Sequence, residues 1–156
     1  MIRTLAFALF TACASGPDVE KLQADVDAAA AAKDYAGAIQ KADAALALPE
    51  VSADAAKAWR FESAKLHAQA AAGNGADVKA GLERLAGSNP KQVTASTYLT
   101  LADKLRAAGD GPGYADLLDA GLKRFPAETA FQTKIDEMKS SADPAEIERL
   151  KALGYL

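Results

Sequence analysis

The chain offers few side chains that could catalyse a reaction or hold a metal ion. His67 is the only histidine, and the only cysteine, Cys13, lies near the N-terminus. A histidine can act as a general base or a metal ligand, but it then needs a positioned partner or further ligands at set spacings. The sequence shows no such pattern around His67. We therefore expect no catalytic residues, no metal site and no cofactor.

The acidic side chains are numerous but do not follow the pattern of a hydrolase. A glycosidase needs two carboxylates that face one cleft. The carboxylates here recur at spacings typical of the solvent-exposed face of a helix, so we expect a charged exterior and no enzyme. The residues are Asp25, Asp27, Glu62, Asp77, Glu83, Asp103, Asp116 and Asp119.

Two glycine-rich segments, residues 73–75 and 109–113, precede predicted helices. A glycine-rich loop at a helix N-terminus can cradle a phosphate group on its backbone N–H groups. Neither segment follows a predicted strand or ends in the Lys-Ser or Lys-Thr pair of a P-loop. Both segments are therefore interpreted as turns between helices.

The composition predicts an all-α protein. Alanine accounts for 39 of the 156 residues, and it has the highest helix propensity because it loses no side-chain entropy in a helix. No segment alternates apolar and polar residues for long enough to indicate a strand. The formal net charge is −3 and no basic stripe is present, so we expect no binding to nucleic acid.

The first residues have the layout of a secretory signal peptide, in which Arg3 precedes an apolar segment and small residues follow. The segment Phe10-Thr11-Ala12-Cys13 resembles the lipobox of bacterial lipoproteins. The resemblance implies that residues 1–12 are removed and that Cys13 becomes an acylated N-terminus, followed by a tether over residues 13–17. Acyl chains would then hold the protein at the membrane.

Two alternative interpretations of this leader remain open. Ala12-Cys13-Ala14 also fits an ordinary A-x-A cleavage site, in which case Cys13 is lost and the protein is soluble and secreted or periplasmic. Residues 1–14 could also be a disordered or apolar tail. The residue after Cys13 is Ala14 and not an acidic residue, which in the lipoprotein family favours the outer membrane, facing the periplasm.

Three segments of the chain end in similar ways, each with a helix that closes at a proline. Pro49, Pro90 and Pro126 are 41 and 36 residues apart. We assign the longer first interval to extra loop residues around 49–53 and 71–76. This pattern of two helices, a turn and a closing proline resembles tetratricopeptide repeats, whose unit is about 34 residues. The resemblance implies a short helical-hairpin solenoid of about three repeats over residues 18–126.

The apolar residues of each predicted helix fall on one face, as a packed helix requires. In the third repeat, Tyr98, Leu101 and Leu105 share such a face. The first helix of the second repeat places Trp59, Ser63, Leu66 and Ala70 together. Residues 127–156 are expected to form C-terminal capping helices, one carrying Phe131, Ile135 and Met138 and the other beginning at Asp143-Pro144.

In tetratricopeptide proteins the first helices of the repeats line a surface that binds extended peptides or partner helices. The resemblance therefore implies a membrane-tethered protein–protein interaction module, an adaptor or scaffold of the bacterial cell envelope, with another protein or peptide as its partner. The alternative is a secreted or periplasmic carrier of a small ligand, such as a glycan or peptidoglycan fragment. The polar neighbours of the buried positions are the expected partner-binding residues: Gln23, Asp27, Arg60, His67, Asp103 and Arg106.

Overall fold

The computed structural model describes residues 18–141 and 143–156, and the predicted signal peptide, Cys13 and tether lie outside these ranges. The regular structure of the described residues is entirely α-helical, which confirms the predicted fold class. The helices are α1 (Val19–Ala31), α2 (Tyr35–Leu46), α3 (Pro49–Ser52), α4 (Ala55–Ala71), α5 (Gly75–Ser88), α6 (Ala95–Ala107), α7 (Gly111–Arg124), α8 (Thr129–Met138) and α9 (Pro144–Leu153).

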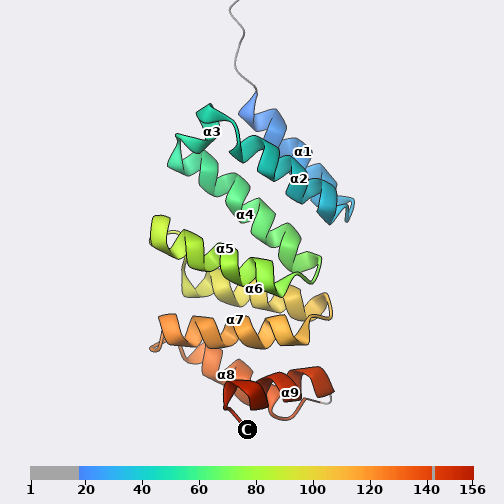
Figure 1. The fold of residues 1–156 in the computed structure, drawn as a ribbon, viewed down its shortest axis with the longest axis vertical. Helices are drawn as coiled ribbons and strands as arrows, with labels where there is room; N and C mark the ends of the chain where they lie inside the picture. Colours follow the sequence, from blue (N-terminus) through green and yellow to red (C-terminus); the bar gives the residue numbers. More distant parts are fainter. Residues whose placement is uncertain (1–17, 142) are drawn as a thin grey trace, which may run out of the picture.

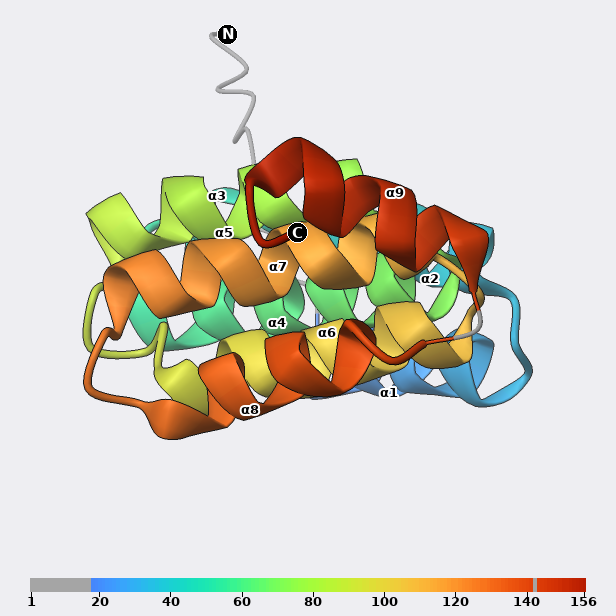
Figure 2. The ribbon, with the colours of Figure 1, turned by 90° about the horizontal axis from the view of Figure 1, so that it is seen from below.

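The helices form pairs that stack along the longest axis of the molecule (Figure 1). The pairs are α1 with α2, α4 with α5, α6 with α7, and α8 with α9. Figure 2 shows the first helix of each pair on one side and the second helix on the other. We call α1, α4, α6 and α8 the first layer, and α2, α5, α7 and α9 the second layer. The C-terminal helices α8 and α9 both pack mainly on α7 and contact each other little, so they cover this end of the stack.

Within each of the first three pairs, a three-residue turn of the same conformation joins the first helix to the second. Its middle residue has a positive φ, which is 61° at Lys33, 75° at Gly73 and 84° at Gly109. Its third residue is the N-cap of the next helix. The N–H of this residue donates to the carbonyl oxygen five residues earlier, at 2.9–3.0 Å. Glycine adopts this left-handed conformation without steric cost. The turns are Ala32-Lys33-Asp34, Ala72-Gly73-Asn74 and Ala108-Gly109-Asp110.

Asp110 connects two neighbouring helix pairs. Its Oδ1 accepts the Gly113 N–H at 2.8 Å and caps α7, and its Oδ2 accepts the Gly75 N–H of α5 at 2.9 Å. Asn74, at the N-cap of α5, makes no side-chain capping bond of its own. A Cβ atom at position 75 would lie 2.6 Å from the Gly113 Cα. Glycine at position 75 therefore allows the start of α5 to approach the start of α7 closely enough for the Asp110 carboxylate to bond both.

Helix α4 separates two hydrophobic clusters. Phe61 and Ala68 pack with α1, α2 and α3, whereas Leu66 and Ala70 pack with the helices that follow. The predicted apolar face of α4 is confirmed at Leu66 and Ala70, but Trp59 is only partly buried. Phe61 is fully buried and was missed. Phe61 lies outside the predicted apolar face because α4 is buried on two faces, one toward each cluster.

The segment predicted as extra loop residues around 49–53 contains the short helix α3. Pro49 lies in its first turn, where a missing backbone N–H costs nothing because that group has no partner within the helix. Val51 is fully buried in the first cluster. Burial of this valine side chain favours an ordered segment, which the composition of the segment did not indicate.

Helix α9 begins where Asp143 and Pro144 predicted, and the Asp143 carboxylate accepts the Ala145 N–H at 2.8 Å. Leu150 is fully buried against the preceding helices. Gly154, with a φ of 84°, ends the helix and turns the chain back. The following residue, Tyr155, consequently reaches α7.

Candidate functional site

The N-terminal part of the first layer brings three of the predicted partner-binding residues together. Gln23 donates its amide N–H to the Asp27 carboxylate at 2.9 Å. Arg60 of α4 forms two hydrogen bonds to the Glu20 carboxylate of α1, at 2.7 and 3.0 Å. The hydrogen bond to Glu20, with a further contribution from the Asp27 charge, raises the pKa of Arg60, and the same guanidinium lowers the pKa of Glu20.

The middle and C-terminal parts of the first layer hold two more predicted residues. Half-buried His67 of α4 lies near α6; burial first, and then the charge of Lys104, lowers its pKa. Asp103 of α6 accepts a hydrogen bond from the Lys134 ammonium of α8 at 2.7 Å, and this bond raises the pKa of Lys134. Ion pairs therefore link α1 to α4 and α6 to α8, whereas His67 of α4 and Lys104 of α6 lie near each other without a hydrogen bond.

We call this set of side chains the polar stripe. It can offer hydrogen-bond donors and acceptors to a partner from α1, α4, α6 and α8, because it contains acidic, basic and amide side chains. Its members are Glu20, Gln23, Asp27, Arg60, His67, Asp103, Lys104 and Lys134.

Arg106, the sixth predicted residue, has a different environment. Its guanidinium donates to the Glu146 carboxylate of α9 at 3.1 and 3.4 Å. It also lies 5.0 Å from the ring centroid of Tyr114, a favourable cation–π distance. The Glu146 side chain is only 4% exposed. Arg106 thus holds α9 against α6 and α7. It also lies near the C-terminal end of the polar stripe. Burial raises the pKa of the Tyr114 hydroxyl, and the charge of Arg106 acts on this pKa together with those of Lys134 and Asp103.

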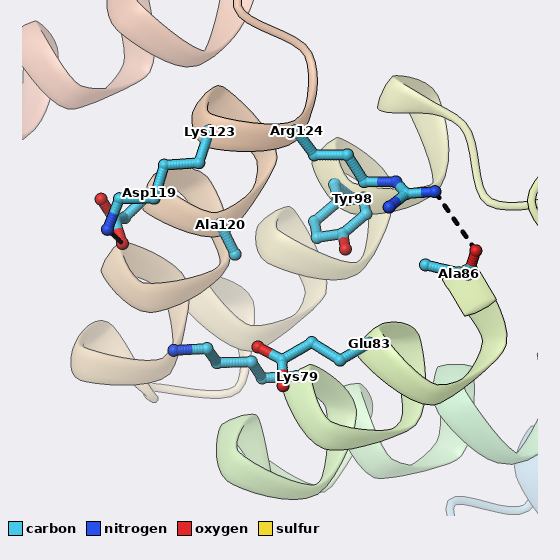
Figure 3. Close-up of a pocket in the computed structure, with 8 residues that line it drawn as sticks. All are labelled: Lys79, Glu83, Ala86, Tyr98, Asp119, Ala120, Lys123 and Arg124. Carbon is cyan, nitrogen blue, oxygen red and sulfur yellow. Dashed lines mark hydrogen bonds and ion pairs between the residues drawn. The ribbon is translucent and has the colours of Figure 1, made fainter.

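A cleft that the sequence analysis missed lies between α5 and α7 of the second layer (Figure 3). Its volume is about 470 Å³, within the range of small-molecule sites. Tyr98 of α6 lies at its floor, and the small side chains of Ala86 and Ala120 leave it open. The cleft is also lined by Lys79, Glu83, Asp119, Lys123 and Arg124.

Asp119 beside the cleft is buried, so its assignment to a solvent-exposed helix face was wrong. The Tyr155 hydroxyl donates to its Oδ1 at 2.9 Å, and the Lys123 ammonium donates to its Oδ2 at 2.8 Å. Burial, reinforced by this hydrogen bond to Asp119, raises the pKa of Tyr155 to about 12. The sequence contained no signal for this contact, since Tyr155 reaches α7 only because the chain turns back at Gly154.

The cleft draws its residues from two consecutive helix pairs, α4–α5 and α6–α7. Lys79 and Glu83 are one turn apart on α5, and Lys123 and Arg124 occupy the last turn of α7. The spacing of these residues along each helix could be predicted from the sequence, but the packing of α5 beside α7 could not. Within residues 18–141 and 143–156, no three His, Cys, Asp or Glu side chains gather as metal ligands.

The comparisons with known proteins add no relative to these observations. No protein-family model, no curated protein and no solved structure matches the chain. None of the helices in the described part of the chain is long and apolar enough to cross a membrane.

Proposed function

We propose that this protein is an interaction module of the bacterial cell envelope that binds another protein or peptide along the polar stripe. The observation that supports the proposal is that polar side chains of all four first-layer helices lie in one row, with ion pairs between α1 and α4 and between α6 and α8. A partner lying across these helices would meet side chains from each helix pair in turn. An extended peptide or a partner helix has the length for such a contact.

The ion pairs of the polar stripe are suited to exchange with a partner. Arg60 and Glu20 are 42% and 76% exposed, and Asp103 is 54% exposed. Exposed ion pairs contribute only about 0–1 kcal/mol to stability, because water screens them. A partner's charged groups can therefore replace the internal partner of Arg60 or Asp103 at small cost to the fold.

The membrane tether is part of the same proposal and rests on the lipobox-like segment that ends at Cys13. Kinship with tetratricopeptide repeats rests on the spacing of the closing prolines and on the recurring turn. The tether is tested by labelling cells with palmitate. We expect label on the wild-type protein and none on Cys13→Ser; label on the variant would contradict lipidation at this residue.

The partner-binding proposal is tested by in-cell crosslinking of the tagged protein, followed by mass spectrometry. We expect a stoichiometric partner with the wild type, which is lost in Arg60→Glu and in Asp103→Lys because each reverses one charge of the polar stripe. Lys41→Glu, an exposed residue of α2 outside the first layer, is the matched control and should retain the partner. A partner that is absent, or equally retained by all three variants, would contradict the proposal.

A further inference from the structure

The α5–α7 cleft carries two opposite charges that the fold leaves unused. Lys79 and Glu83 both line it, four residues apart on α5. Neither side chain forms an ion pair with any residue that the structure describes. Lysine N-terminal to glutamate is the less favourable order for a pair at this helical spacing, which agrees with their separation.

The Tyr98 hydroxyl faces the same cleft and forms no hydrogen bond with any residue that the structure describes. Its ring is packed edge-on against Phe125, with centroids 5.9 Å apart, so the position of the phenol is fixed. Figure 3 shows the hydroxyl directed into the cleft toward Glu83. Burial raises the pKa of Tyr98; the Arg124 charge opposes this shift, and the Glu83 charge adds a smaller increase. The hydroxyl thus stays protonated and can both donate and accept a hydrogen bond.

The other charged residues of the cleft are already engaged. Asp119 is bonded to Tyr155 and Lys123, and the Arg124 guanidinium donates to the Ala86 carbonyl oxygen at 3.4 Å (Figure 3). A carbonyl partner leaves the positive charge of Arg124 in place, so a ligand meets two cationic groups, Lys79 and Arg124, together with the free Glu83 carboxylate and a phenol. A ligand that carries both charges can pair with the Glu83 carboxylate and with a cationic group of the cleft at once, whereas a simple cation would be repelled by Lys79 and Arg124.

We propose that this cleft binds a small zwitterion of the free amino acid or dipeptide class. The ligand's carboxylate is held by the Lys79 ammonium, and its ammonium by the Glu83 carboxylate and the Tyr98 hydroxyl. The cleft volume of about 470 Å³ accommodates a molecule of this size. The site lies on the second layer and does not depend on partner binding by the polar stripe. The alternative function, carriage of a small ligand, would use this site.

Alanylalanine is the probe, titrated into the isotopically labelled full chain while backbone amide resonances are followed by NMR. We expect saturable shifts confined to residues 79–86, 98 and 119–124. N-acetyl-alanylalanine lacks the ammonium and alanylalanine amide lacks the carboxylate, so each should bind about tenfold more weakly or worse, because each loses one charge-assisted hydrogen bond. Inorganic phosphate should bind more weakly than alanylalanine, because it leaves the Glu83 carboxylate without a partner.

Lys79→Gln and Glu83→Gln should each weaken alanylalanine binding by about tenfold for the same reason. Lys41→Gln is the matched surface control and should bind as the wild type does. Circular dichroism of each variant establishes that it is folded. Absence of saturable shifts, equal affinity for either blocked dipeptide, or unchanged binding by both cleft variants would each overturn the proposal.

Discussion

Lys33 has the least favourable backbone conformation among the three equivalent turns. A left-handed conformation costs a residue with a Cβ atom about 1–2 kcal/mol, and glycine is free of that cost. Gly73 and Gly109 occupy the corresponding positions of the next two turns, whereas Lys33 has a φ of 61°. The lysine side chain is exposed, and no hydrogen bond or ion pair of the described structure holds it.

Lys33→Gly should accordingly stabilise the protein. Relief of the left-handed strain outweighs the larger entropy of glycine in the unfolded chain, and we expect the free energy of unfolding to rise by about 0.5–1 kcal/mol. Urea denaturation followed by circular dichroism measures the change. Gly109→Ala is the converse experiment and should lower stability, since no neighbouring atom would obstruct its Cβ and only the φ of 84° opposes it. A destabilised Lys33→Gly would contradict this account.

His67 should make the stability of the protein depend on pH below neutrality. Its pKa in the folded state lies below the usual 6.5 because of burial and the Lys104 charge. The unfolded state therefore binds the proton more readily, and stability is full above pH 6.5 and falls as the pH drops through the folded-state pKa. Denaturation from about pH 8 to about pH 5 should show this loss in the wild type. His67→Gln should lack it, whereas an identical slope in both proteins would exclude His67 as its cause.

At the scale of elements, the turns are connected to one another as well as to their own helices. Asp34 caps only α2, through the Gly37 N–H at 2.9 Å. Asp110 caps α7 and also receives the first N–H of α5. The two aspartates therefore occupy equivalent turns but hold different numbers of helices.

Asp110→Ala should consequently destabilise the protein more than Asp34→Ala. Loss of an aspartate N-cap costs about 1 kcal/mol. Asp110→Ala loses a second hydrogen bond as well, so we expect a total of about 2 kcal/mol, twice the effect of Asp34→Ala. Urea denaturation of both variants supplies the comparison, and equal losses would show that the bond between helix pairs adds no stability.

The C-terminal residues attach α9 to α7 through a hydrogen bond between Tyr155 and the buried Asp119. Tyr155→Phe should lower the free energy of unfolding at neutral pH by about 1–2 kcal/mol, because a hydrogen bond to a charged group is lost. The pKa of about 12 means that the folded state favours the protonated phenol. The stabilisation is therefore complete below the usual value of 10 and is lost as the pH rises through about 12. Denaturation and ultraviolet titration of the phenol test both points, and a wild-type phenol that titrates at its usual value would contradict them.

Much of the molecule at its largest scale could be predicted from local patterns. Alanine content and helical periodicity predicted the all-α stack, and Asp143-Pro144 marked the start of its last helix. The features that were missed depend on contacts between distant segments. Phe61 belongs to a second face of α4, Val51 orders α3, and Asp119 is covered by a chain end that returns to α7. The α5–α7 cleft likewise exists only because two helix pairs lie side by side.

The separation of the two hydrophobic clusters at α4 has a consequence for cooperativity. Helices α1–α3 could detach from α4 while Leu66 and Ala70 keep their contacts with the C-terminal cluster. Such an array behaves as neighbouring cooperative units with separate opening equilibria. Native-state hydrogen exchange should then show amides of α1 and α2 exchanging through a sub-global opening of lower free energy than that of α6 and α7. Exchange of all helices at one common free energy would instead identify α4 as a rigid bridge that makes the whole chain unfold as a single unit.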